Sequence, residues 1–267
     1  MHLKAPRLPD RLWQRRVRGA LLGLCTWLAG SLSAAAADVI ISARYTEPTT
    51  RYAHGVLGDA IEYGALEIRV EDTSPQHNTF ATDLLYIPSI HTVTVRLPSD
   101  RVFEDLMPRL VEIDQSGMPK VLVVETQEDA GAQLAIYNAL GHKIATTPHI
   151  GTRNRWLAPI GAADLDGDGN VEIAYIDRPH LAKTLRIWRF EDGSFNEIAT
   201  LHGLTNHRIG EDFITGGIRD CGTSPELIVA SADWQKIVSV RYDGEWKQTP
   251  LARFSHGAIK RALACSP

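Results

Sequence analysis

Residues 164–172 read Asp-Leu-Asp-Gly-Asp-Gly-Asn-Val-Glu, and this stretch is the most informative of the chain for its fold. Carboxylates stand at every second position at its start. They can surround one hard cation only if the backbone coils tightly, which the two glycines permit. A main-chain carbonyl and the final carboxylate would complete an oxygen cage of the kind that calcium prefers. The predicted calcium ligands are Asp164, Asp166, Asp168, Asn170 and Glu172.

An EF-hand is the obvious competing interpretation of this loop. The EF-hand needs a bidentate Glu at its twelfth position, and counting from Asp164 that position holds Tyr175. Residues 173–176 form a short apolar, β-favouring run, so the loop leads into a strand and not into a helix. An Asp/Gly-rich hairpin turn without metal is the simpler alternative.

An Asp-x-Asp-Gly-Asp-Gly-x-x-acidic loop that feeds an apolar strand resembles the calcium loop of the FG-GAP/VCBS repeat, the blade of integrin-like β-propellers. The resemblance covers nine residues, and Glu172 stands where that family usually has Asp. It implies one structural calcium ion and a propeller fold.

Internal repetition supports this expectation, because three segments align at a period of about fifty residues, within the range for propeller blades. Each has two apolar strands separated by a turn, at 121–124 and 134–137, 173–176 and 185–188, and 227–230 and 237–240. The sequence therefore predicts an all-β fold, a small β-propeller of about four blades of four-stranded antiparallel sheets. The approximate repeats are 52–100, 101–152, 153–206 and 207–258. Residues 39–44 are expected to pair with the C-terminal unit.

In this alignment Asp166 matches Asp114 and Asp220, whose neighbours lack clustered carboxylates. Only one repeat should therefore hold a metal ion tightly.

The N-terminal residues 1–37 have the pattern of a secretory signal peptide. Six basic residues precede an apolar core and a run of alanines that ends at Ala37. Twin-arginine export and a lipoprotein site at Cys25 fit less well than general secretion. The mature domain would span 38–267 and be periplasmic or extracellular.

Removal of this leader makes the chain more acidic. It carries six Lys or Arg and one Asp, a net charge of +5, so the formal charge changes from −4 to −9. Nucleic acid is an unfavourable partner for such a protein, and no membrane span is expected in the mature chain. The partner is predicted to be an unknown protein or glycan.

Two cysteines remain after the leader, Cys221 and Cys265, and export places them in an oxidising compartment. A disulfide that tethers the C-terminal tail is predicted. Two unpaired thiols are the alternative.

No common catalytic motif occurs in the sequence. Four histidines fall at equivalent repeat junctions, namely His54, His149, His202 and His256. They would either cap repeated turns or line a central channel, where a ring of imidazoles with Asp59 and Asp212 would bind a transition metal or small anion. The tryptophans of the repeats would either fill the core or stack on glycans.

The favoured function is a secreted or periplasmic calcium-binding interaction module, with no catalytic residues assigned. The alternative is a hydrolase or lyase with a His/Asp site at the mouth of the channel. Clustering of the four junction histidines around a pocket would favour the enzyme.

Overall fold

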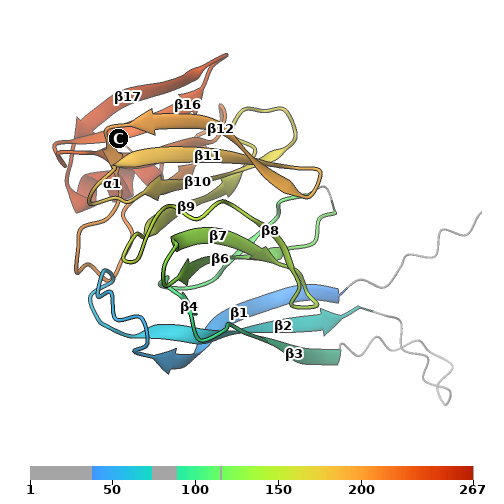
Figure 1. Cartoon of the computed structure of the whole chain (residues 1–267). Coiled ribbons are helices and arrows are strands. Elements are labelled where there is room, and N and C mark those ends of the chain that lie inside the picture. The colour runs from blue at the N-terminus through green and yellow to red at the C-terminus, as the bar shows by residue number, and fades with distance from the viewer. Residues whose placement is uncertain (1–37, 74–88, 115, 267) are drawn as a thin grey trace, which may run out of the picture. The chain divides into compact units, whose positions relative to one another are not determined.

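The computed structural model describes residues 38–73, 89–114 and 116–266, all of which lie in one compact unit of the chain (Figure 1). These residues form seventeen strands and one short helix, so the predicted all-β class is confirmed. The predicted signal peptide, residues 1–37, lies outside the described residues. No helix in the described ranges is both long enough and apolar enough to cross a membrane.

The strands form three hydrogen-bonded antiparallel sheets. The first sheet folds into two layers, because side chains of β2 pack face to face with side chains of β6 and β7. The first layer contains β1 (Asp38–Thr49), β2 (Glu62–Asp72) and β3 (Ser89–Arg96). The second contains β4 (Arg101–Phe103), β5 (Arg109–Val111), β6 (Lys120–Gln127), β7 (Gly131–Tyr137) and β8 (Lys143–Thr146). A single residue pair, Tyr63 opposite Phe103, links the two layers through β2 and β4.

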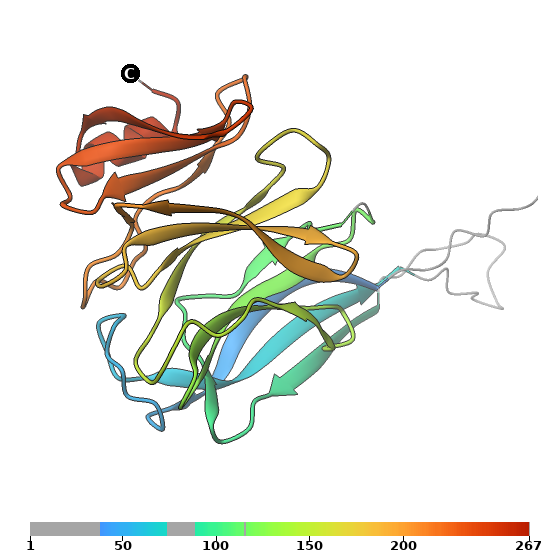
Figure 2. The same ribbon diagram turned by 45° about the horizontal axis from the view of Figure 1, so that its top comes forward.

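The remaining two sheets follow in chain order, as Figures 1 and 2 show. The four-stranded sheet contains β9 (Leu157–Ala163), β10 (Val171–Asp177), β11 (Thr184–Glu191) and β12 (Ser194–His202). The last sheet contains β13 (Leu204–Thr205), β14 (Gly217–Arg219), β15 (Glu226–Ser231), β16 (Lys236–Tyr242) and β17 (Trp246–Arg253). The helix α1 (His256–Leu263) ends the described chain.

Strands β6 and β10 are buried on both faces, and they explain how neighbouring layers stack. In β6, Val121 and Val123 face the core shared with β2, whereas Leu122 and Val124 face the core shared with β10. Strand β10 likewise divides its side chains between the cores on its two faces. Because alternate residues of a strand point to opposite faces, a strand between two cores needs a continuous apolar run. The runs that define the sequence repeat are therefore the middle strands of stacked layers.

Strand β1 pairs with β2 over its whole length, from Asp38 opposite Asp72 to Thr49 opposite Glu62. The prediction that residues 39–44 pair with the C-terminal unit is therefore wrong. Closing a short loop to the adjacent β2 costs less chain entropy than pairing with a distant segment. In the described chain no strand of the first sheet pairs with the last sheet.

The sequence does not predict the helix α1, because His256 falls at an expected repeat junction. Ser255 caps the helix, with its hydroxyl accepting a hydrogen bond from the Ala258 main-chain N–H. Ile259 is buried against Ile228 and Ile237 on the outer face of the last sheet. The helix spans only two turns, too few to give a clear periodic pattern.

The predicted pairing of Cys221 and Cys265 is confirmed: the two residues are joined by a disulfide and their Cα atoms lie 5.7 Å apart. Cys221 lies between β14 and β15, and Cys265 follows α1. The disulfide therefore fixes the helix and the chain end to the last sheet.

Candidate functional site

The predicted calcium loop connects β9 to β10 as a tight hairpin. The Asp164 carboxylate accepts hydrogen bonds from the main-chain N–H groups of Gly167 and Gly169, at 2.7 and 3.0 Å. Both glycines have positive φ, +80° and +88°, a conformation that side chains disfavour. The sequence thus folds the loop around its first carboxylate.

Three of the five predicted ligand residues converge. Carboxylate oxygens of Asp164, Asp166 and Glu172 all lie within 4.8 Å of one another. Glu172 stands at the start of β10, where it is fully buried, and accepts a hydrogen bond of 2.8 Å from the Leu165 main-chain N–H. The loop therefore presents clustered oxygen donors on a fixed backbone.

Among the predicted carboxylate ligands, Asp168 is placed differently. Asp168 stands outside the group of three, and its carboxylate accepts a hydrogen bond of 2.8 Å from the Asn170 main-chain N–H. That hydrogen bond is the main reason why the pKa of Asp168 lies below its usual value. Asp168 is thus exposed and held by the main chain of Asn170.

Arg189 is the functional residue of this loop that sequence reasoning missed. It lies on β11 directly opposite Glu172 and binds three carboxylates. Its Nε donates to Glu172 Oε1 at 2.9 Å, its Nη1 lies 2.8 Å from Asp168 Oδ2, and its Nη2 donates to Asp166. Only the strand register, which the sequence does not specify, brings this arginine to the loop.

The charges of the cluster are balanced through Arg189. Burial raises the pKa of Glu172, while hydrogen bonds from Arg189 and Leu165 oppose the rise. Hydrogen bonding to Glu172 raises the pKa of Arg189, so the guanidinium stays charged. The Arg189 guanidinium therefore supplies the positive charge for the carboxylates that the sequence alone attributes to a metal ion.

The side chains present fit calcium by the chemistry of their donors. Calcium takes six to eight oxygen ligands, and carboxylates are the usual protein donors. Asp164, Asp166 and Glu172 supply such oxygens from one hairpin. Arg189 contacts two of the three, so a bound cation and the guanidinium would compete for the same carboxylates.

The four junction histidines do not form a ring. His149 hydrogen bonds the Gly131 carbonyl at 2.8 Å, and His202 lies 3.1 Å from the Thr184 hydroxyl. His256 begins α1, where it packs edge-on against aromatic rings. Within the described ranges, neither Asp59 nor Asp212 belongs to a group of three metal-ligating side chains. The interpretation of these residues as one transition-metal ring is not supported.

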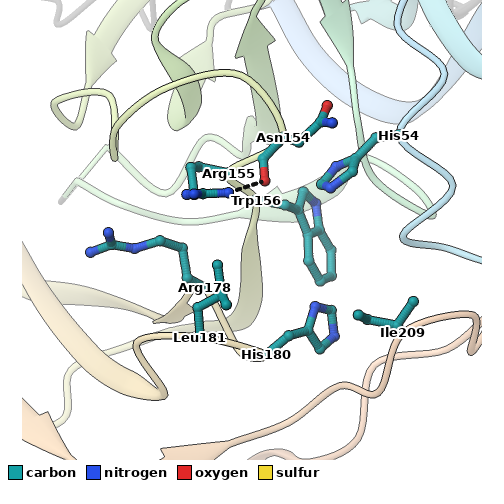
Figure 3. Close-up of a pocket in the computed structure, with 8 residues that line it drawn as sticks. All are labelled: His54, Asn154, Arg155, Trp156, Arg178, His180, Leu181 and Ile209. Carbon is teal, nitrogen blue, oxygen red and sulfur yellow. Dashed lines mark hydrogen bonds between the residues drawn. The ribbon is translucent and has the colours of Figure 1, made fainter.

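A different set of residues forms a pocket of about 240 Å³ (Figure 3). Of its lining residues, only His54 is among the junction histidines that the sequence suggests as candidate site residues. Its lining comes from the loops after β1, β8, β10 and β13. The residues that line it are His54, Asn154, Arg155, Trp156, Arg178, His180, Leu181 and Ile209. These loops are separate in sequence, so only the stacking of the four layers brings them together.

Behind the pocket lies a buried glutamate, Glu104. Its Oε1 lies 2.5 Å from His54 Nδ1, and its main-chain carbonyl accepts a hydrogen bond of 2.8 Å from the Trp156 indole. Burial raises the pKa of Glu104, although hydrogen bonds from His54 and Thr126 oppose this. Burial, together with the charge of Glu104, raises the pKa of Glu62 to about 9.

A pair of histidines, His180 and His207, borders the same pocket. His180 Nε2 lies 3.0 Å from His207 Nδ1, and His207 Nε2 lies 2.9 Å from the Glu211 carbonyl oxygen. Burial and the neighbouring His207 lower the pKa of His180 to about 4. Burial also lowers the pKa of His207. Both imidazoles are therefore neutral at pH 7.

The tryptophans divide between core and surface. Trp156 and Trp188 are buried in the core between the second layer and the four-stranded sheet. Trp234 is half-buried and its ring lies under the Arg208 guanidinium, 4.1 Å from ring centroid to carbon.

No protein-family model matches this chain, and a search of curated proteins returns no significant match.

Proposed function

We propose that this protein is an exported calcium-binding interaction module whose four layers are the blades of a small FG-GAP/VCBS-like β-propeller. The observation that carries the proposal is the convergence of Asp164, Asp166 and Glu172 within 4.8 Å on one hairpin. Calcium would be held by these carboxylates and would stabilise the hairpin between β9 and β10. Its role is structural, and the partner is a protein or glycan bound elsewhere on the surface.

The propeller assignment is supported by the stacking of the layers. Each of the four layers contributes a loop to the same end of the stack, where the pocket lies. The loop after β1 also contacts the loop after β13, because the Gly210 N–H donates a hydrogen bond of 3.1 Å to the Val56 carbonyl. First and last layers therefore meet through loops.

Export is supported by the leader pattern and by the Cys221–Cys265 disulfide. Disulfides persist in oxidising compartments such as the periplasm and the extracellular space.

The test is thermal unfolding with calcium and with a chelator. Binding stabilises the folded state by RT ln(1 + [L]/Kd), about 2.7 kcal/mol at a hundredfold excess over Kd. Wild-type protein should melt at a higher temperature with calcium, and Asp166→Ala should not. The matched control is Asp220→Ala, which removes the aspartate at the equivalent repeat position and should keep the calcium response. Identical wild-type melting in both buffers would refute the proposal.

A second candidate function is acid–base catalysis, favoured by one observation. His54 lines the pocket and is oriented by the buried Glu104, the arrangement that orients a general base. The test compares wild type with His54→Gln in hydrolysis of nitrophenyl esters, glycosides and phosphates. Equal rates on every compound would remove this candidate.

A further inference from the structure

The pocket at the end of the stack contains a cation that has no counter-ion. In the part of the chain that the structure describes, no carboxylate lies within salt-bridge distance of Arg155. The only hydrogen bond of its side chain there, of 3.2 Å, goes from Nη1 to the carbonyl of the preceding Asn154. The preceding and following arginines of the sequence are both paired with carboxylates, because Arg153 binds Glu128 and Arg178 binds Asp177. An unpaired guanidinium in an acidic protein is a ready partner for an anion.

The lining around this cation holds no carboxylate. The acidic group behind His54 and Trp156, Glu104, is fully buried. Its side chain is already engaged by His54 and Thr126. An anion in the pocket would therefore face Arg155 without meeting a charged carboxylate of the lining.

The base of the Arg155 side chain is held in place. The Arg155 carbonyl accepts a hydrogen bond of 2.9 Å from the Ala132 N–H at the start of β7. A Cβ atom on Gly131 would lie 3.1 Å from the Arg155 Cβ, so the two backbones approach closely. A preorganised cation loses less entropy on binding than one on a mobile loop.

Apart from Asn154 and Arg178, the rest of the lining is aromatic or apolar. Figure 3 shows the Trp156 indole between the imidazoles of His54 and His180. Leu181 and Ile209 also line the pocket, and both are exposed although they are large and apolar. Such side chains favour a ligand with a flat or apolar body.

The imidazoles of His54 and His180 offer polar groups to a ligand. The Glu211 carbonyl can only accept, so His207 donates to it from Nε2 and accepts at Nδ1 from His180 Nε2. A neutral His180 then keeps its Nδ1 lone pair. His54, bound to Glu104 through Nδ1, keeps Nε2. These groups add polar selectivity without adding negative charge.

From these features we propose that the pocket binds a small organic anion, a carboxylate whose charged end pairs with Arg155 and whose apolar body lies against Leu181 and Ile209. The volume of about 240 Å³ lies below the roughly 300–1,000 Å³ of pockets for drug-sized ligands, which restricts the ligand to a single small ring. This site is separate from the carboxylate loop and does not depend on calcium.

The experiment titrates the ¹⁵N-labelled chain at pH 7 with benzoate and with benzamide, which has nearly the same shape but no charge. Benzoate should shift the amide signals of residues 154–156 and 180–181 and bind at least about tenfold more tightly than benzamide. Arg155→Gln should weaken benzoate binding by roughly 10- to 100-fold and leave benzamide binding unchanged. The matched control, Arg241→Gln on the exposed side of β16, removes the same charge away from the pocket and should bind benzoate as wild type does.

Equal affinity for benzoate and benzamide, or shifts that Arg155→Gln does not alter, would overturn the proposal. So would the absence of any shift at millimolar benzoate in a folded wild-type sample. The wild-type amide spectrum reports folding in the same experiment, and Arg155→Lys, which keeps the charge, should retain part of the affinity.

Discussion

Arg189 determines the electrostatics of the carboxylate loop. A cluster of carboxylates is unstable unless positive charge lies nearby, and Arg189 binds Asp166, Asp168 and Glu172 at once. Calcium and this guanidinium can each neutralise the cluster. The balance between them sets how strongly the stability of the protein depends on calcium.

The first prediction concerns Arg189→Gln. Removing the guanidinium leaves the buried Glu172 without its charged partner, so stability in chelator should fall by about 1–3 kcal/mol. Calcium should restore most of this loss, because it replaces the missing charge and no longer competes with an arginine. Urea unfolding in chelator and in calcium measures both effects.

Arg186→Gln is the matched control for this prediction, since Arg186 lies on the same strand and binds Asp177 and Glu197 away from the loop. Its loss of stability should be the same in both buffers. A calcium-independent loss in Arg189→Gln as well would contradict competition at the loop.

The second prediction concerns Glu62, whose pKa is raised to about 9 by burial and by Glu104. In the unfolded chain a glutamate ionises near pH 4.5, so between these values the folded state holds the extra proton. Stability from this group is therefore present below pH 4.5 and is lost as pH rises towards 9. The slope for one such proton is about 1.4 kcal/mol per pH unit.

Glu62→Gln keeps a neutral side chain of similar shape and should flatten this slope between pH 5 and pH 9. Urea unfolding across that range measures the slope, with Glu67→Gln at an exposed ion pair on the same strand as control. An unchanged slope in Glu62→Gln would show that Glu62 is ionised in the folded protein at neutral pH.

At the scale of the elements, the sequence predicts the middle strands of the layers clearly and the strands at the sheet edges only weakly. The runs at 121–124, 173–176 and 227–230 lie in β6, β10 and β15 because each must fill a core on both faces. Strand β3 has mostly exposed side chains, so its sequence carries no such signal. The partner of β1 and the helix α1 depend on chain closure and tertiary packing, which periodicity does not report.

The same contrast applies to the candidate sites. The loop ligands were predictable because the carboxylates and glycines are adjacent in sequence. Arg189 depends on the register of β10 and β11, and the pocket depends on four separate loops. His180 and Glu104 carry no local motif, so only tertiary structure identifies them.

The third prediction compares two glycines near β14, both with positive φ. A Cβ atom on Gly216 would lie 2.2 Å from the Ile228 carbonyl oxygen on β15, whereas Gly222 has open space around it. Gly222→Ala should cost about 1–2 kcal/mol, the cost of the backbone conformation alone. Gly216→Ala should cost clearly more, because the last sheet must also shift. Similar losses in thermal unfolding would contradict this packing.

The fourth prediction concerns the disulfide that closes a segment with a sequence separation of 44. The chain-entropy argument gives a stabilisation of roughly 3–4 kcal/mol for a loop of this length. Urea unfolding with and without reductant should show this difference in wild type and none in the double variant Cys221→Ser, Cys265→Ser. Hydrogen exchange should show the loss first in α1, which contacts β14 and β15. Reductant without effect on wild type would contradict the assignment.

At the scale of the whole molecule, the stack of layers explains why the two candidate sites are separate. The carboxylate loop lies in a hairpin of the four-stranded sheet. The hydrogen bonds that hold its backbone are made within residues 164–172. The pocket needs loops from all four layers. Calcium would therefore act on the stability of one hairpin, while ligand binding would report the arrangement of the whole stack.

The most direct test of the calcium site is a calorimetric titration of calcium into the chelator-treated chain at neutral pH. The account predicts one calcium ion per chain, weaker binding of magnesium, and loss of the signal in Asp166→Asn but not in Asp220→Asn. The absence of binding heat at millimolar calcium, or equal binding by Asp166→Asn, would contradict it and leave Arg189 as the cation of the loop.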